Sequence, residues 1–177
     1  KHSENMIPDY ATHSVGAGGF VYDDKTNKIL VVKELDYQLF KLPGGAGDKG
    51  EDISEIACRE VKEETNIDTE FQSLICFREL HNFRYGKTDF YYICLMKPLS
   101  YDIKYPTNEI ADCQWMDVDE YRNEVAGKSK LNTFIADLAM KCIHNSIDSP
   151  NRALKKTEFT DIYSKTGKLR QYNVYHV

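Results

Sequence analysis

The chain has 177 residues, with a hydrophobic fraction of 41% and a charged fraction of 29%, a balance that predicts one globular domain. Its formal net charge of -5 disfavours a protein that coats nucleic acid, because such proteins usually carry a basic surface that neutralises phosphates. No stretch approaches the roughly 18 apolar residues of a membrane span. These properties exclude a membrane-spanning protein and make a nucleic-acid partner an unfavoured expectation.

The five cysteines are scattered and include no CxxC pair. An odd number without paired spacing predicts neither a disulfide framework nor a zinc site, and it indicates a reducing compartment. We expect an intracellular protein located in the cytoplasm. Mitochondrial and nuclear locations stay open, because the chain opens on Lys1 and a targeting segment upstream would not be visible.

Strand patterns dominate the first third of the chain. Residues 1–13 read as a polar extension, and the segments 14–22 and 28–33 read as a hairpin with charged residues in its turn. A short third strand is predicted at residues 39–42, ended by Pro43. The glycine-rich run that follows can bring its backbone close to a ligand.

The remaining elements alternate between helix and strand. Helices are predicted at 52–65, 117–124 and 131–144, and strands at 71–80, 89–96 and 112–118. Residues 157–177 resemble a hairpin with a turn at Gly167. This order predicts an α/β fold in which a mixed β-sheet is sandwiched between helices. We expect a domain at 14–146 and a tail at 147–177 that packs on it. The strand at 15–22 or the tail could supply an exposed edge for a homodimer.

Carboxylates crowd the predicted helix at 52–65, and their angles around its axis bear on their role. With Glu60 at 0° and about 100° per residue, Glu64 falls near about +40° and Glu63 near about -60°. The apolar face, at roughly +20° to +160°, holds Ile53, Ala57, Cys58 and Val61. Glu60 and Glu64 therefore border the face that should meet the core.

Two interpretations of this acid cluster stand side by side, an exposed charged face and a metal site. Three carboxylates within one turn repel each other, and half-buried carboxylates shift toward the neutral form. A bound cation would keep them ionised, and hard oxygen donors of this kind suit Mg²⁺ or Mn²⁺. Helical geometry alone leaves both interpretations open.

The spacing of fixed residues from Gly45 to Ile67 is more specific. Gly45 is followed by five residues and Glu51, and then by seven residues and the run REVKEETNI. This segment, called the box below, resembles the Nudix box G-x5-E-x7-R-E-U-x-E-E-x-G-U, with U an aliphatic residue, at every fixed position but one. The departure is Asn66, where the pattern has glycine. Asn tolerates a positive φ better than other non-glycine residues, so we expect a small cost in stability and no loss of chemistry.

The resemblance implies the Nudix fold and metal-dependent hydrolysis of phosphoric anhydride bonds. In that family the box helix presents carboxylates to divalent cations, which assigns Glu60, Glu63 and Glu64 as catalytic residues and ligands of Mg²⁺ or Mn²⁺. The carbonyl of the residue before the box glycine, here Gly44, usually joins them. Glu51 and Arg59 are expected to form a structural ion pair that ties the loop to the helix.

The resemblance also bears on the general base and on substrate contacts. A carboxylate must take a proton as water attacks phosphorus, and this base is either a box glutamate or Glu109, whose alternative is an ordinary surface role. Substrate contacts are sought on the loop at 81–88. Candidates are His81, Phe83, Arg84 and Lys87. A plain polar loop is the alternative for these four residues.

The resemblance extends over residues 15–121, to plant ADP-ribose/NADH-type Nudix hydrolases and to animal Nudix proteins encoded antisense to basic fibroblast growth factor. It implies a small nucleoside diphosphate derivative as substrate, with ADP-ribose or NADH first. Alternatives are capped RNA, oxidised nucleotides or coenzyme A, and a binding or regulatory module with little turnover. Members of this subgroup commonly carry a further N-terminal domain.

Overall fold

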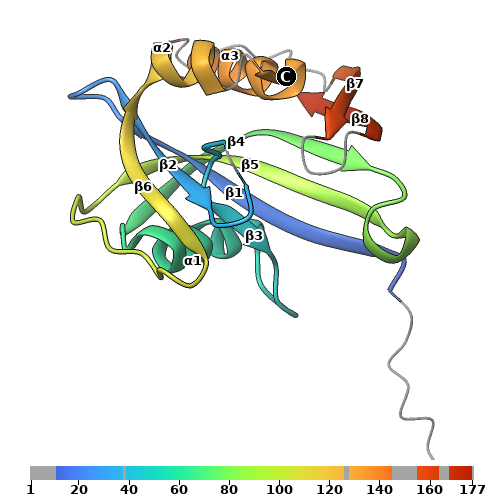
Figure 1. Cartoon of the computed structure of the whole chain (residues 1–177), viewed down its shortest axis with the longest axis horizontal. Coiled ribbons are helices and arrows are strands. Elements are labelled where there is room, and N and C mark those ends of the chain that lie inside the picture. Colours follow the sequence, from blue (N-terminus) through green and yellow to red (C-terminus); the bar gives the residue numbers. More distant parts are fainter. Residues whose placement is uncertain (1–10, 38, 126–127, 145–154, 164–167, 177) are drawn as a thin grey trace, which may run out of the picture.

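A mixed sheet of eight strands forms the centre of the molecule (Figure 1). The structure is a computed structural model that describes residues 11–37, 39–125, 128–144, 155–163 and 168–176. The strands are β1 (His13–Asp23), β2 (Lys28–Glu34), β3 (Gly44–Ala46), β4 (Thr69–Leu80), β5 (Thr88–Pro98), β6 (Ile110–Asp117), β7 (Lys155–Tyr163) and β8 (Lys168–His176). Their order is β6-β2-β1-β5-β4-β8-β7, and β3 pairs with β1. The central pair β1–β5 is parallel, whereas the other pairs are antiparallel.

Helices lie on both sides of this sheet, as Figure 1 shows. One face is covered by α1 (Ile53–Thr65), and the other by α2 (Val118–Glu120), a π-helical turn (Tyr121–Val125) and α3 (Lys130–His144). A short 3-10 turn, Arg84–Gly86, lies between β4 and β5. The predicted α/β sandwich is confirmed. None of the helices in the described ranges is long and apolar enough to cross a membrane.

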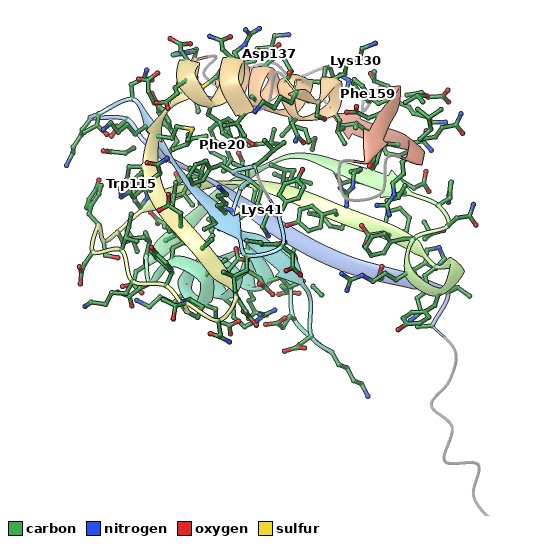
Figure 2. The ribbon with its side chains drawn as sticks, viewed as in Figure 1. Phe20, Lys41, Trp115, Lys130, Asp137 and Phe159 are labelled. Atoms are coloured by element: carbon green, nitrogen blue, oxygen red, sulfur yellow. The ribbon has the colours of Figure 1, made fainter. Side chains whose placement is uncertain are left out.

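Alternation along the strands divides the core into two clusters. Phe20 and Val31 lie in the cluster under α3, whereas Val21 and Val32 lie in the cluster under α1. Successive side chains of a strand point to opposite faces, so a strand covered on both faces is apolar throughout. Figure 2 labels Phe20 between the sheet and the helices on the α3 side. The site described below lies where α1 meets the sheet.

The strand predicted at 39–42 is wrong. Lys41 makes only an isolated bridge to Val32, and the strand lies beyond the proline, at Gly44–Ala46. The strand was predicted from the apolar residues at 39–42, and the glycine-rich run after Pro43 was predicted to be a loop. Glycines on both strands let the two backbones approach closely, so a segment with little strand propensity still pairs with β1.

The C-terminal hairpin of β7 and β8 extends the sheet beyond β4. Cys76 of β4 pairs with His176 of β8, and Val174 is fully buried. The predicted turn at Gly167 lies outside the described residues. The expectation that 15–22 supplies an exposed edge is wrong, because β1 is central and pairs with three strands. The domain boundaries at residues 13/14 and 146/147 stay predictions.

All five cysteines are free thiols, and Cys76, Cys94 and Cys113 are buried. Burial raises the pKa of each of these three thiols to about 12. They are therefore protonated at neutral pH and act as small apolar side chains of the core rather than as nucleophiles.

Candidate active site

The loop that opens the box is held against β1 by backbone pairing, and its glycines make that approach feasible. Gly44 has a φ of 151°, and a Cβ there would lie 2.4 Å from the Cα of Gly18. A Cβ on Gly45 would lie 2.5 Å from Oε2 of Glu60. Gly44 therefore lets the loop lie against β1, and Gly45 lets the Glu60 carboxylate lie against the loop backbone.

Helix α1 ends at the position where the box departs from its pattern. Asn66 adopts a left-handed conformation with φ of 64°, as predicted, and its backbone N–H donates to the carbonyl of Lys62 at 2.8 Å. Its side-chain amide also donates to the carbonyl of Asp102 at 3.0 Å. Asparagine thus terminates the helix where glycine is usual and adds a contact that glycine does not have.

The three box carboxylates differ in exposure. The side chains of Glu60 and Glu64 are 14% and 13% exposed, whereas that of Glu63 is 60% exposed. The predicted placement of Glu60 and Glu64 beside the apolar face is therefore confirmed. Two carboxylates this close to the core need cationic or hydrogen-bonding partners to remain ionised.

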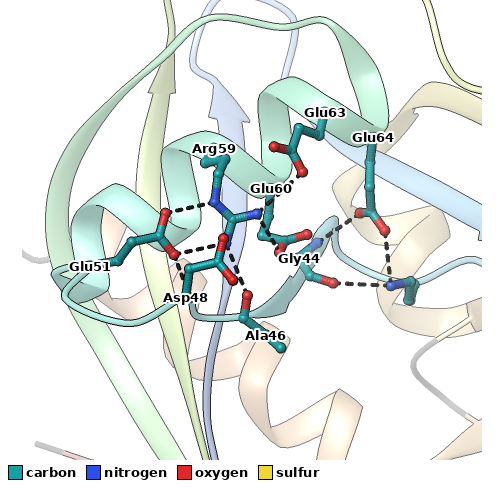
Figure 3. Close-up of polar contacts among 9 residues, drawn as sticks. Gly44, Ala46, Asp48, Glu51, Arg59, Glu60, Glu63 and Glu64 are labelled. Carbon is teal, nitrogen blue, oxygen red and sulfur yellow. Dashed lines mark hydrogen bonds and ion pairs between the residues drawn. The ribbon is translucent and has the colours of Figure 1, made fainter.

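Arg59 supplies several of these partners (Figure 3). Its guanidinium forms a bidentate pair with Glu51 at 2.7 and 2.9 Å, and Nη1 contacts Glu60 at 2.8 Å and Glu63 at 3.2 Å. Nη2 also donates to the carbonyl of Ala46 at 2.9 Å. The hydrogen bonds from Arg59 lower the pKa of Glu51 to about 2. Arg59 therefore connects the loop, the helix and two of the three carboxylates.

Glu64 is held by a different cation. Its Oε2 accepts from the backbone N–H of Gly44 at 2.8 Å, and its Oε1 lies 3.4 Å from the ammonium of Lys41. That ammonium also donates to the carbonyl of Gly44 at 3.3 Å and pairs with Glu34 at 2.8 Å. Burial raises the pKa of Glu64, although Lys41 and the Gly44 N–H oppose this effect. Burial lowers the pKa of Lys41, but Glu64, Tyr91 and Glu34 together outweigh this effect and the net shift is upward.

The carboxylates point to these internal cations and not to one another. Across the described ranges, no three His, Cys, Asp or Glu side chains are grouped so that they could hold a metal ion as they stand. Gly44 and Glu64 nevertheless direct two oxygens at a single ammonium. A hard cation finds the donor types that it prefers at this point.

Glu109 lines the same small cavity as the box glutamate Glu64. It comes immediately before β6, and its carbonyl accepts from the backbone N–H of Leu35 at 3.0 Å. A cavity of about 280 Å³ brings Glu109 together with Glu64, Glu34 and Asp36. The loop at 106–110 thus presents a fourth carboxylate beside the box helix.

Lys41 and Gly44 line a larger cavity of about 620 Å³, which shares Glu34 with the smaller one. Phe83, Arg84 and Lys87 line this cavity, whereas His81 does not. The Nδ1 atom of His81 instead lies 3.0 Å from the Oγ1 atom of Thr88. The guanidinium of Arg84 lies 5.6 Å from the centre of the Phe83 ring. The cavity therefore combines aromatic and basic side chains from the loop at 81–88 with the beginning of the box.

Comparison with known protein families gives a match to the model described as "NUDIX domain", over residues 12–138. This range contains the box, Glu109 and most of the sheet. The chain belongs to the Nudix family. In the Nudix chain, β7 and β8 lie outside the matched range and complete the sheet beyond β4.

Relatives and solved structures agree with this assignment. The chain is 46% identical to Nucleoside diphosphate-linked moiety X motif 6 of Xenopus laevis, over 68% of this chain and 57% of that protein. It is 39% identical to Nudix hydrolase 6 of Arabidopsis thaliana, over 77% of this chain and 51% of that protein. The fold is similar to that of a MutT NUDIX hydrolase from Burkholderia pseudomallei, with a TM-score of 0.59 and 20% sequence identity. The similarity covers 72% of this chain and 98% of that one. The chain thus spans little more than half the length of these two relatives.

Sequence reasoning missed several polar residues of the Nudix site. Lys41 fell within a segment predicted as a strand, and Arg78 lies in β4, where it pairs with Asp89 at 2.8 Å and stacks over Tyr91 at 5.1 Å. Tyr91 is partly buried, and the loss of hydration around its hydroxyl raises its pKa to about 12. No local pattern marks these residues, because strand pairing brings them to the cavity from distant positions.

Proposed function

We propose that this Nudix chain is a Mg²⁺- or Mn²⁺-dependent pyrophosphohydrolase of nucleoside diphosphate derivatives, acting on ADP-ribose or NADH. The observation that carries the proposal is the convergence of the Gly44 carbonyl and the Glu64 carboxylate on one cation, beside the cavity of about 620 Å³. The name of the Xenopus laevis relative, which refers to a moiety linked to a nucleoside diphosphate, supports the substrate class.

The donor set fits a divalent metal. Glu60 and Glu64 are nearly buried carboxylates, Glu63 is exposed beside them, and the Gly44 carbonyl adds a neutral oxygen. When bound there, a divalent cation would neutralise diphosphate oxygens and lower the pKa of a water molecule. The ammonium of Lys41 already occupies a cation position between two of these oxygens, which supports the fit.

The remaining side chains have roles that follow from their charge and position. Glu109, in the smaller cavity with Glu64, is proposed as the base that takes the proton of the attacking water, and a box glutamate is the alternative. Phe83 is proposed to stack on a base, and Arg84 and Lys87 to pair with phosphate. His81 stays a candidate only for a substrate that extends beyond the cavity.

A substrate panel tests the proposal. ADP-ribose, NADH, capped RNA, oxidised nucleoside triphosphates and coenzyme A are incubated with the chain and either metal in H₂¹⁸O, and the products are identified by mass. We expect AMP and a phosphorylated remainder from ADP-ribose or NADH, with one ¹⁸O atom in a phosphate product.

A matched pair of variants supplies the control. Glu64→Gln should lower the rate about a hundredfold or more, because it removes a charged ligand of the metal that neutralises the diphosphate oxygens. Glu120→Gln, at an exposed position of α2, should leave the rate unchanged. Equal rates for wild type and Glu64→Gln on every substrate would contradict the proposal.

A further inference from the structure

Lys41 lines the larger cavity and pairs with Glu34 and Glu64, which line the smaller one. Figure 2 labels it in the middle of the molecule, near the sheet. It comes from the segment between β2 and β3, and Val32 fixes its backbone through hydrogen bonds of 2.8 and 2.9 Å. The side chain is 27% exposed, so its ammonium depends on protein partners for much of its solvation.

The partners of this ammonium are the oxygens that the proposed function assigns to a metal. Lys41 Nζ lies 3.3 Å from the Gly44 carbonyl and 3.4 Å from Glu64 Oε1, and both contacts are longer than its 2.8 Å pair with Glu34. A divalent cation and an ammonium cannot both occupy the point where these two oxygens converge, because like charges at such a distance repel.

We propose that Lys41 is a built-in counter-cation that holds the Gly44 and Glu64 oxygens in place and is exchanged for the divalent metal when the site is loaded. This inference rests on the proposed function. Lys41 keeps Glu34 as its carboxylate partner after the exchange, and its ammonium turns toward the larger cavity, which both residues line. It is a positioning residue for the metal-binding oxygens.

The exchange explains two features of the site together. In the metal-free protein, Lys41 gives the nearly buried Glu64 carboxylate a cationic partner, which a carboxylate with little access to water requires. The longer contacts to Gly44 and Glu64 are also the ones that a divalent ion can replace most easily. Arg59 is likewise the cationic partner of Glu60. It also binds Glu51 and the carbonyl of Ala46, so its position does not depend on the metal site.

Amine labelling of the wild-type chain tests the exchange without relying on activity. The chain is treated with a limiting amine-reactive ester, with EDTA or with saturating Mn²⁺, and the labelling of each lysine is measured by mass spectrometry. Lys41 should react about fivefold faster with Mn²⁺, because it loses two hydrogen-bond acceptors. Exposed Lys97 is the internal control and should react equally in both conditions.

A double-mutant cycle on Mn²⁺ affinity, followed by the electron paramagnetic resonance of free Mn²⁺, gives a second measurement. Lys41→Met should tighten Mn²⁺ binding about three- to tenfold, whereas Lys97→Met should not. Glu34→Gln should weaken binding more when Lys41 is present than in the Lys41→Met background, because it removes the partner of the displaced ammonium.

The outcomes separate this inference from the proposed function. If wild type does not bind Mn²⁺, both are overturned. If Mn²⁺ binds but the labelling of Lys41 is unchanged, or the two substitutions are strictly additive, the metal site stands and the exchange of Lys41 is overturned.

Discussion

At the scale of single residues, Arg59 and Lys41 form ion pairs with different carboxylates of the acidic site. Arg59 binds Glu51, Glu60 and Glu63 through one planar guanidinium, which suits several carboxylates at fixed angles. Lys41 binds Glu64 as a point charge on a flexible stem. The rigid guanidinium of Arg59 therefore holds the loop and the helix together, and the movable ammonium of Lys41 lies where the divalent metal is expected.

The Arg59–Glu51 pair makes stability depend on pH in a defined window. The pKa of Glu51 falls from its ordinary value of 4.5 to about 2 in the folded state. Its stabilising effect is therefore complete above pH 4.5 and is lost as the pH falls toward about 2. Glu51→Gln should be less stable than wild type at pH 7, and the difference should shrink between pH 5 and 3. Urea unfolding at each pH measures it, with exposed Glu70→Gln as the control that shows no such convergence.

Glu109 gives a second prediction at this scale. If it is the base, Glu109→Gln should lower kcat about a hundredfold and remove the acidic limb of the pH–rate profile, while Mn²⁺ affinity changes little. Steady-state kinetics on the substrate found in the panel measure the effect, with Glu120→Gln as the matched control. A normal kcat for Glu109→Gln would transfer the role to a box glutamate.

At the scale of elements, helix α1 depends on an asparagine cap. Asn66→Ala should lower the free energy of unfolding by about 1–2 kcal/mol, because alanine tolerates the left-handed conformation poorly and loses the contact with Asp102. Asn66→Gly should change the free energy of unfolding by less than about 1 kcal/mol. Glycine adopts a φ of 64° without strain, and this gain offsets the lost contact with Asp102. Chemical denaturation of the three proteins measures this. An alanine variant as stable as the glycine variant would count against the cap.

Most elements could be predicted from the sequence because their signals are local. Helix α1 has an apolar face with a period of 3.6 residues, and β2 has a run of β-branched and aliphatic residues. The strand β3 could not be predicted, since it exists only through pairing with Gly16–Gly18. Lys41 was missed for the same reason, because its role depends on Glu34, Gly44 and Glu64 meeting in space.

At the scale of the whole molecule, the hairpin of β7 and β8 is part of the sheet and of the core. Val174 and Tyr172 of β8 belong to the cluster under α3, and Asn173 donates to Glu79 of β4 at 2.9 Å. Removing this hairpin would expose the edge of β4 and part of the core. The described strands of this hairpin therefore contribute to the stability of a cavity that they do not themselves line.

Paired substitutions in β8 test this contribution. Val174→Ala should lower the free energy of unfolding by about 1–3 kcal/mol, because Val174 is fully buried. Leu169→Ala, at a side chain that is 70% exposed, should change it by less than about 0.5 kcal/mol. Thermal unfolding of both variants measures the difference. Two equally small effects would indicate a hairpin that is only loosely attached.

The parallel pairing of β1 with β5 has a consequence for synthesis on the ribosome. Ser14 and Asp89, which hydrogen bond across this pair, are 75 positions apart, and Asn173 and Glu79 are 94 positions apart. At about 5–20 residues per second, β1 waits roughly 4–15 s for its central partner. In the last third of that interval, after residue 65, the nascent chain carries a complete box helix beside an incomplete sheet, with an apolar strand available to chaperones or to other nascent chains.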